Sequence, residues 1–307
     1  MTWDYDCAVI GGGPGGLVSA LYLARFKRSV AFIRWGKPRA AWIPRTHNLI
    51  GYDRGISGSL LLRRLERQLS RVAQEQLSRV HLFPAEGVVR KYRSGFRVGF
   101  GNSEEITVRK VILATGVTDV QPELENLATL RKQGLLRYCS ICDGFEYRNQ
   151  RIAVFAKDDE GLQKGLFIRQ WTPKIHFLLP ENFTPGQRRM RQIQAARVKV
   201  HPCRILKATA LEENNQALLE LTLNDQSALR VRVAYVELGS RVNSSAFENL
   251  VGMKRTRAGF IITTTEQRTS IPGVFAVGDC VNQLGQISVA AGQAAIAATA
   301  IHNDLLG

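Results

Sequence analysis

The sequence predicts an α/β protein built from two doubly wound units, the second of which is inserted into the first. An apolar run of strand length at residues 6–10 leads into a glycine-rich turn and then into a helical pattern at 17–25. A second strand-to-helix start follows at Arg151, and the chain returns to the character of its first unit after residue 242. Strands that alternate with helices are typical of parallel sheets covered by helices.

The other elements follow from apolar runs of strand length and from longer stretches with helical spacing. In the first unit we expect strands at residues 6–10, 29–33, 88–92, 96–100, 111–114 and 274–277, and helices at 17–25, 58–76 and 286–303. In the second we expect strands at 151–155, 175–179, 198–201, 218–223 and 231–237, and helices at 160–170 and 185–196. The domains expected are therefore 1–117 with 243–307, and an inserted domain at 118–242.

The composition is that of a globular protein with a strong basic surplus. The 307 residues suffice for two domains, and 45% of them are apolar. Lys and Arg number 42 against 26 acidic residues, a net charge of +16 that attracts nucleic acid, anionic lipid, an acidic protein or a nucleotide cofactor without choosing among them. The five cysteines form no regular framework, and no signal peptide precedes them, so we expect a cytoplasmic location.

The glycine turn near the start has the spacing of a dinucleotide-binding fingerprint. Gly11 permits a tight turn, Gly13 lets the backbone approach a pyrophosphate, and Gly16 allows close helix packing, with Pro14 opening the helix. The pyrophosphate then lies on the helix N-terminus. A glycine-rich turn without a ligand is the alternative. With this motif, both units are expected to be Rossmann-like dinucleotide-binding domains.

Two later segments resemble those of flavoproteins with two dinucleotide-binding domains. Ala114-Thr115-Gly116 ends the strand expected at 111–114, and Gly278-Asp279 closes the run Gly-Val-Phe-Ala-Val-Gly-Asp. The resemblance implies an FAD in the first domain, with Asp279 accepting hydrogen bonds from its ribityl chain. An ordinary turn aspartate is the alternative.

Two further stretches extend this resemblance to the flavin ring. Gln286 and Ile287 open a helix rich in small residues, which resembles the helix that faces the ring in those flavoproteins. An Ala-rich core helix without a ligand is the alternative. Residues 46–51 resemble a loop of the same proteins, and this resemblance places Asn48 near the isoalloxazine.

A pair of cysteines, Cys139 and Cys142, precedes Asp143 just before the second strand-to-helix start. Two thiols at this spacing at a helix start can close a redox-active disulfide, and the helix N-terminus stabilises a thiolate. A zinc half-site is the main alternative, but no second Cys or His pair has a suitable spacing, so we expect no metal. The remaining cysteines are expected to be structural: Cys7, Cys203 and Cys280.

The Cys-x-x-Cys-Asp sequence in this position resembles that of low-molecular-weight thioredoxin reductases, and the resemblance covers essentially the whole chain. It implies an FAD-dependent disulfide oxidoreductase that passes electrons between the flavin, the Cys139–Cys142 pair and a partner disulfide. It also implies that Cys142 lies nearer the flavin, that Cys139 exchanges with the partner and that Asp143 protonates the leaving thiolate. The implied partner is a thioredoxin-like or other disulfide protein, and the implied assembly is a homodimer.

Two positions depart from that family. After the strand at 151–155, where a second glycine fingerprint belongs, the chain reads Ala-Lys-Asp-Asp-Glu-Gly at 156–161, and the His-Arg-Arg cluster that recognises a 2′-phosphate is missing. Three acids facing a dinucleotide argue against NADPH. In the first domain, the acid expected to hold the adenosine ribose is replaced by Arg34, which together with Trp35 could contact a phosphate or stack on adenine.

With these departures, the sequence resembles a group of thioredoxin reductase-like chains, chiefly cyanobacterial, that lack the NADPH site. The ferredoxin-linked type among them tends to carry an aromatic C-terminal tail, which is missing from the end 301–307, so the resemblance favours the diflavin-linked disulfide oxidoreductases. It then implies a second FAD in the inserted domain. The alternatives are an NADPH- or ferredoxin-dependent thioredoxin reductase and a non-catalytic flavoprotein redox sensor.

The resemblance reduces the range of partners that the net charge left open. An acidic electron carrier such as ferredoxin or flavodoxin fits the basic surplus, and we expect neither nucleic acid nor membrane as a partner. Basic residues without an intervening acid at 185–207 form either a docking face for such a carrier or an ordinary solvated surface.

Overall fold

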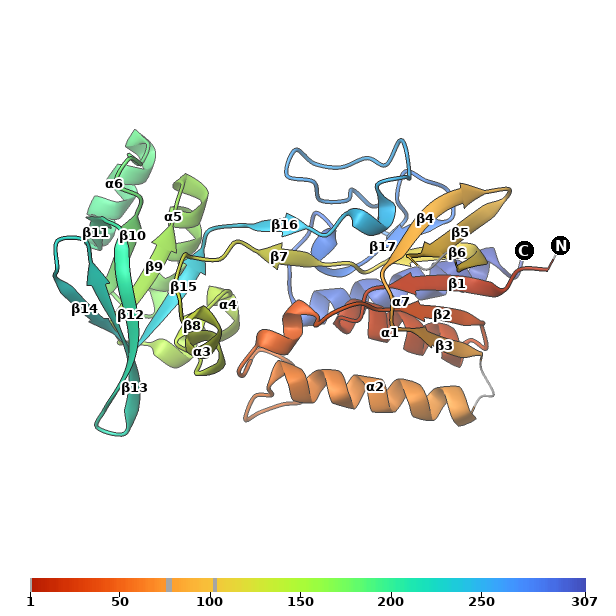
Figure 1. Cartoon of the computed structure of the whole chain (residues 1–307), viewed down its shortest axis with the longest axis horizontal. Coiled ribbons are helices and arrows are strands. Elements are labelled where there is room, and N and C mark those ends of the chain that lie inside the picture. The colour runs from red at the N-terminus through yellow and green to blue at the C-terminus, as the bar shows by residue number, and fades with distance from the viewer. Residues whose placement is uncertain (1, 76–78, 102–103) are drawn as a thin grey trace. The chain divides into compact units, whose positions relative to one another are not determined.

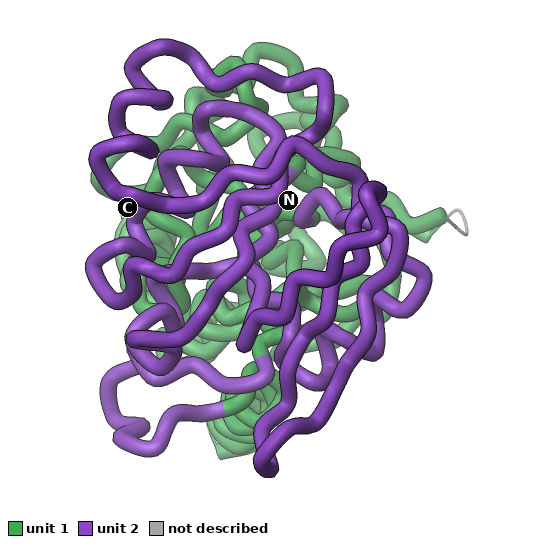
Figure 2. The backbone as a smooth tube through the Cα atoms, turned by 90° about the vertical axis from the view of Figure 1, so that its left-hand side faces the viewer, with its two compact units in different colours: residues 1–43, 57–118, 241–307 green, residues 44–56, 119–240 purple. Residues whose placement is uncertain are grey.

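The computed structural model describes all residues except 1, 76–78 and 102–103, and it divides into two compact units (Figures 1 and 2). The first unit comprises Met1–Ile43, Ser57–Thr118 and Arg241–Gly307. The second comprises Pro44–Ile56 and Asp119–Ser240. The chain passes between them along β7 (Val117–Asp119) and β16 (Ser240–Val242), which pair as a two-stranded sheet.

The first unit is a mixed sheet with helices. Its strands run in the order β3 (Val80–Phe83), β2 (Val30–Ile33), β1 (Tyr5–Ile10), β6 (Glu105–Leu113), β5 (Gly95–Phe100) and β4 (Gly87–Tyr92), and β17 (Val274–Ala276) also pairs with β6. The pairs of β1 with β2 and β6, of β2 with β3 and of β6 with β17 are parallel, whereas β4, β5 and β6 are antiparallel neighbours. The helices are α1 (Pro14–Arg25), α2 (Gly58–Glu75) and α7 (Ile287–Asp304).

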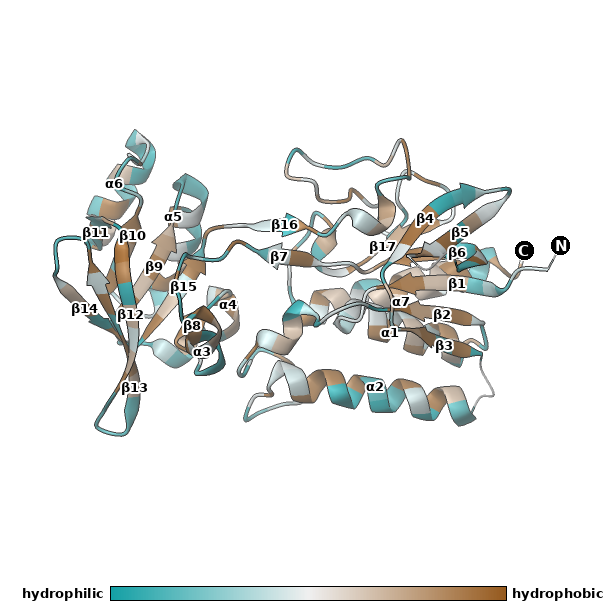
Figure 3. Cartoon of the chain, viewed as in Figure 1, coloured by the Kyte–Doolittle hydropathy of each residue, from teal (hydrophilic) through white to brown (hydrophobic). Residues whose placement is uncertain are grey.

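Strand β1 is buried on both faces of this sheet. Cys7 and Val9 pack into a core with the three helices, while Ala8 and Ile10 face a second core beneath the antiparallel strands. This double burial explains the unbroken apolar run that marks β1 in the sequence. Helix α2 is instead amphipathic: Leu61, Leu62, Leu69 and Val72 are buried and its arginines are exposed. Apolar and polar residues alternate along it in Figure 3.

The second unit contains a five-stranded parallel sheet in the order β11 (Lys199–Pro202), β10 (Ile175–Leu179), β9 (Ile152–Ala156), β15 (Val233–Glu237) and β8 (Leu136–Arg137). A separate antiparallel sheet is formed by β12 (Ile205–Glu213), β13 (Gln216–Leu223) and β14 (Ala228–Val231). The helices are α3 (Leu127–Lys132), α4 (Ser140–Asp143), α5 (Asp159–Leu166) and α6 (Gln187–Ala196), with short 3₁₀ turns after α4 and α5.

The expected α/β class with two Rossmann-like units is confirmed, but several elements differ. Strands β3 and β12 and helix α3 were not expected, and the helix expected at 160–170 tightens into a 3₁₀ turn after Leu166. The strand expected at 231–237 is β15, which begins at Val233, because Val231 ends β14 of the other sheet and the chain bends at Arg232. The expected end of α2, Gln76, lies outside the described residues.

The segment Pro44–Ile56 groups by its contacts with the second unit, although we expected it within the domain 1–117. Its ends are tied together by the backbone bridge between Thr46 and Ile56, so it forms a closed loop. Nδ1 of His47 in this loop lies 3.5 Å from a carboxylate oxygen of Glu146, beside the redox segment. None of the helices within the described ranges combines the length and the apolarity that a membrane span requires.

Two histidines stack between neighbouring strands of the second unit. The rings of His176 on β10 and His201 on β11 lie 5.1 Å apart, and Nδ1 of the first is 2.9 Å from Nε2 of the second. Burial, together with the charges of His201, Lys199 and Arg151, lowers the pKa of His176 to about 4. The folded state therefore keeps this ring neutral.

We expect this pair to make the second unit less stable in acid. Because the pKa of His176 is lower in the folded than in the unfolded state, its stabilising contribution is complete above about pH 6.5 and is lost as the pH falls toward 4. The loss is at most about 1.4 kcal/mol per pH unit for one group. Amide hydrogen exchange of β10 at pH 7 and pH 5 should show this loss, and His176→Phe should reduce it. Equal losses in both proteins would contradict the prediction.

Candidate active site

The glycine turn between β1 and α1 is shaped by close backbone contacts. Gly11 has φ +126°, and a Cβ there would lie 2.0 Å from the carbonyl oxygen of Ala114. A Cβ on Gly16 would lie 1.8 Å from the carbonyl oxygen of Gly11. At Gly13 the nearest atom to such a Cβ is Cβ of Pro38, at 3.9 Å. The first and third glycines are thus required by packing, whereas a Cβ on the second would make only an ordinary contact.

The N-terminus of α1 is free to receive an anion. Gly13 is its N-cap and supplies no side-chain acceptor, Pro14 occupies the first turn, and no acidic residue lies there. The first backbone N–H groups of a helix lack intrahelical partners, and the helix dipole favours negative charge at this end. A dinucleotide pyrophosphate fits this turn.

The predicted Ala-Thr-Gly segment lies beside this turn within the first unit. Ala114 donates its N–H to the carbonyl of Ile10 at 2.8 Å, so the Ala-Thr-Gly run lies beside the end of β1. The carbonyl oxygen of Thr115 accepts a hydrogen bond from the Asn243 side chain. Gly116 has φ +66°, and a Cβ added there would have no atom within 4 Å. These backbone positions leave room beside the turn for a bound cofactor.

The turn that carries Asp279 is held by the last helix. Gly278 has φ +77° and donates its N–H to the buried side chain of Gln293 on α7 at 2.6 Å. Asp279 lies 3.4 Å from the guanidinium of Arg39. Gln286 caps the start of α7 and Ile287 is its first residue. The structure thus places these predicted residues at one end of the first unit's sheet, near the glycine turn.

Arg34 does not take the part of the missing ribose acid. Its guanidinium pairs with Glu66 of α2, and its side-chain carbons would lie 3.0 to 3.1 Å from a Cβ added to Gly12. The neighbouring Trp35 is 72% exposed. The guanidinium thus has a carboxylate partner in the first unit, and the neighbouring indole is exposed.

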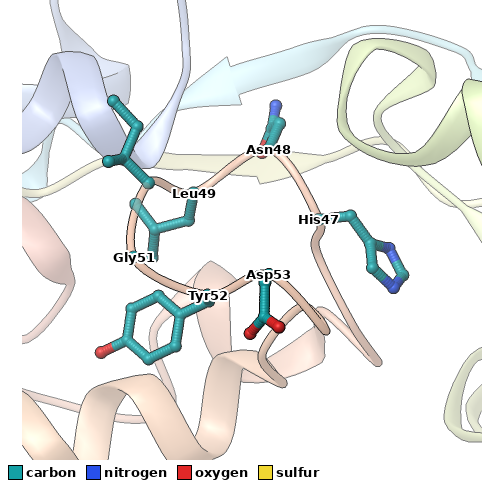
Figure 4. A pocket seen from close by; sticks show the side chains of 7 residues that line it. His47, Asn48, Leu49, Gly51, Tyr52 and Asp53 are labelled. Atoms are coloured by element: carbon teal, nitrogen blue, oxygen red, sulfur yellow. The ribbon is translucent and has the colours of Figure 1, made fainter.

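Asn48 lies in the second unit, in the loop Pro44–Ile56 (Figure 4). Its Oδ1 accepts a hydrogen bond from the Thr46 hydroxyl at 2.7 Å. Residues 47–53 line an open cavity of about 530 Å³, which includes the 92%-exposed Ile50. The structure does not bring Asn48 into the same unit as the glycine turn.

The cysteine pair forms a disulfide in the second unit. Cys139 and Cys142 are joined with an S–S distance of 2.05 Å, and their Cα atoms lie 5.4 Å apart. Cys139 is the N-cap of the four-residue helix α4, which follows β8 directly. Both cysteines are half-buried, whereas Cys7 and Cys280 are fully buried free thiols.

Asp143, which follows Cys142 directly, is buried with a partner on each carboxylate oxygen. It is 5% exposed. The Tyr235 hydroxyl donates to Oδ1 at 2.8 Å, and Nη1 of Arg137 lies 3.0 Å from Oδ2. Burial raises the pKa of Asp143 to about 6, although Arg137 and Tyr235 act to lower it. No sequence motif indicated either partner, since both lie in ordinary strands.

The N-terminus of α5, where the family has its second glycine fingerprint, is occupied by the chain's own carboxylates. Asp158 is the N-cap, and its Oδ1 accepts the backbone N–H of Gly161 at 2.8 Å. Asp159 accepts the N–H of Gly186 at 3.2 Å, and Glu160 adds a further charge in the first turn. No group of three or more His, Cys, Asp or Glu side chains among the described residues is arranged to hold a metal.

Residues 5–156 and 181–294 match the family model for pyridine nucleotide-disulphide oxidoreductases. The chain belongs to this family. Its members' chemistry makes the protein a flavin-dependent disulfide oxidoreductase, and membership implies FAD. The first unit fits that cofactor through its open glycine turn and uncapped helix, and Gly11, Gly13, Gly16 and Asp279 would hold it.

Relatives within the family include thioredoxin reductases. That of Buchnera aphidicola is 27% identical, covering 90% of this chain and 89% of the relative, and that of Listeria monocytogenes is 25% identical, covering 95% and 91%. Among solved structures, the thioredoxin reductase of Streptococcus pyogenes superposes with a TM-score of 0.86 at 23% identity over 98% of both chains. The atypical thioredoxin reductase of Desulfovibrio vulgaris is 28% identical over 97% of both chains, with a TM-score of 0.52.

Proposed function

We propose that the protein is a thioredoxin reductase-like disulfide oxidoreductase that does not take its electrons from NADPH. The observation that carries this proposal is the contrast between the two helix N-termini. The start of α1 has no side-chain cap and no acidic residue in its first turn, whereas the start of α5 is capped by Asp158 and carries Asp159 and Glu160. A dinucleotide at α5 would have to displace a hydrogen-bonded carboxylate and approach two more negative charges.

The proposed reaction passes two electrons through the Cys139–Cys142 pair. When bound, reduced FAD supplies those electrons to the disulfide, which becomes a dithiol. The dithiol then reduces a disulfide of a partner protein by thiol exchange, and its own disulfide re-forms. The thioredoxin reductases among the relatives support a thioredoxin-like partner. Cys139 is proposed to exchange with that partner and Cys142 to lie toward the flavin.

The electron donor is proposed to be an acidic carrier such as a ferredoxin or flavodoxin. The net charge of +16 supports an acidic partner. In the second unit, basic side chains on α6 and the strands that follow it are exposed: Arg188, Arg191, Arg197, Lys199, Arg204 and Lys207. We also propose that the protein is a homodimer. A cytoplasmic location is proposed as well, and the free thiols Cys7, Cys203 and Cys280 support a reducing compartment.

A second FAD in the inserted domain would define the diflavin-linked group. The carboxylates at α5 would oppose its pyrophosphate as they oppose that of NADPH, so its phosphates would have to bind away from this helix start. Flavin released per chain after denaturation decides the point. Two flavins support the diflavin assignment, and one flavin leaves a donor protein as the proposed source of electrons.

Anaerobic reduction tests the proposed independence from NADPH. We expect NADPH to leave the oxidised flavin absorbance of the loaded protein unchanged over minutes, because its phosphates meet the carboxylates at α5. Illumination with a sacrificial donor should bleach the flavin, and thiol titration should then find the additional thiols of Cys139 and Cys142. Rapid bleaching by NADPH would contradict the proposal. A bleached flavin without new thiols would instead favour a non-catalytic redox sensor.

A further inference from the structure

The strand register of the second unit places two side chains together behind the disulfide. In the parallel pair β8 and β15, Arg137 is the register partner of Tyr235. Register partners project from the same face of a sheet, so their side chains are neighbours. Both reach the carboxylate of Asp143, which follows the second cysteine of the pair.

The arrangement is buried and fully connected. The side chain of Arg137 is 13% exposed and Tyr235 is fully buried. Beyond its contact with Asp143, Arg137 donates from Nε to the carbonyl of Gly134 at 2.9 Å and from Nη2 to the Tyr147 hydroxyl at 2.8 Å. The guanidinium is therefore held by three partners, and both carboxylate oxygens of Asp143 are bound.

Burial and these partners act on Asp143 in opposite directions. Removal from water favours the neutral acid, while the charge of Arg137 and the hydroxyl of Tyr235 favour the carboxylate. Of the more distant groups, Glu146 raises the pKa and His47 lowers it. The pKa of Tyr235 is itself raised by burial and by Asp143, so its phenol stays a donor. The balance leaves the carboxyl with a pKa of about 6.

We propose that Arg137 and Tyr235 are positioning residues that make Asp143 a proton carrier, able both to release and to recover a proton during disulfide exchange. This inference rests on the proposed function of the Cys139–Cys142 pair. Without the two partners, burial would hold the proton on Asp143 through the neutral range, and the carboxyl could donate it once but not take it back.

In the proposed exchange, which starts from the reduced Cys139–Cys142 dithiol, each proton and electron is accounted for. Cys139, having lost its proton to solvent, attacks the partner disulfide: a bond forms between the two sulfurs, the partner S–S bond breaks, and the leaving thiolate takes the proton of Asp143. The carboxylate next takes the proton of the Cys142 thiol, and Cys142 attacks Cys139. Their disulfide re-forms, the second partner thiolate leaves and takes a proton from solvent, and two electrons have passed to the partner.

The test is the titration of Asp143 in the oxidised, flavin-loaded full-length protein. It is followed by the infrared band of the protonated carboxyl that Asp143→Asn removes. Tyr235→Phe deletes one hydrogen bond to the charged form, so we expect the midpoint to rise by about one pH unit. Arg137→Gln should raise it further, and Arg137→Lys should restore part of the difference. The pH profile of disulfide exchange, measured after photoreduction, should move by the same amount.

Tyr147→Phe is the matched control, because this hydroxyl contacts Arg137 but not Asp143. It should leave the midpoint within a few tenths of a unit. An unchanged midpoint in folded Tyr235→Phe would overturn the proposal, even if Arg137→Gln failed to fold. The titration needs neither an electron donor nor a partner, so its outcome is independent of whether the protein uses NADPH.

Discussion

Cys139→Ser is expected to lower the reduction of a partner disulfide by about 10³-fold or more, while the flavin remains bound. A serine hydroxyl is not ionised at neutral pH and cannot form the mixed disulfide on which exchange depends. The measurement is thiol release from oxidised thioredoxin after photoreduction of the flavin. Photoreduction itself should proceed in the variant, since the glycine turn and Asp279 lie in the first unit and are unaltered.

Cys203→Ser is the control for this experiment. Cys203 is a half-buried free thiol of the same unit, and burial, aided by Asp225 and Glu181, raises its pKa to about 11. Because it stays protonated at neutral pH, its replacement should leave the rate unchanged. Full activity in Cys139→Ser would show that the pair is not the exchange site.

Cys142→Ser separates the roles of the two cysteines. It leaves Cys139 able to attack a partner but removes the thiol that would resolve the mixed disulfide. Mass spectrometry should then find the partner attached to Cys139. Attachment to Cys142 in Cys139→Ser, with none to Cys139 in Cys142→Ser, would reverse the assignment.

Gly16→Ala is expected to have the second large effect, on folding itself. The added Cβ would lie 1.8 Å from the carbonyl oxygen of Gly11. Because the clash is with backbone atoms, no side-chain rotation can relieve it, and α1 would have to move away from β1. Forcing α1 away from β1 should cost several kcal/mol, on the order of a severe overpacking. The thermal unfolding temperature of the flavin-free protein should fall sharply, and a fall of less than about 2 °C would contradict the prediction.

Two other glycines separate folding from flavin binding. Gly13→Ala adds a Cβ whose nearest neighbour is 3.9 Å away, so the flavin-free protein should unfold near the wild-type temperature. Flavin affinity should nevertheless fall, because the methyl group occupies the space that a pyrophosphate needs. Gly292→Ala, on the exposed side of α7 with nothing within 4 Å, should raise stability by about 0.5 to 1 kcal/mol and leave the flavin bound.

The family and the redox chemistry could be predicted from the sequence because their motifs are local. A glycine at a given spacing determines which turn the backbone can make, and two cysteines separated by two residues are close in any helical start. The loss of the second fingerprint is also local, since Asp158 caps α5 through a contact three residues along the chain. The strands that are buried on both faces could be predicted because they are unbroken apolar runs in the sequence.

Contacts between segments that are distant in the sequence could not be predicted from local motifs. Arg137 and Tyr235 reach Asp143 only because β8 pairs with β15 in one register, and nothing in either short strand indicates that partner. Likewise, no local pattern indicates that Glu66 of α2 lies beside Arg34.

By itself, then, the sequence determined the two Rossmann-like units, the glycine turn, the Cys-x-x-Cys-Asp site and the acidic start of α5. Each of these depends on backbone conformation or on neighbours a few residues away, which periodicity and spacing record directly. Only the tertiary structure decided that the loop Pro44–Ile56 groups with the second unit and that Asp143 is buried between a guanidinium and a phenol. Strand pairing and burial create those environments, and both arise from long-range packing that no local pattern encodes.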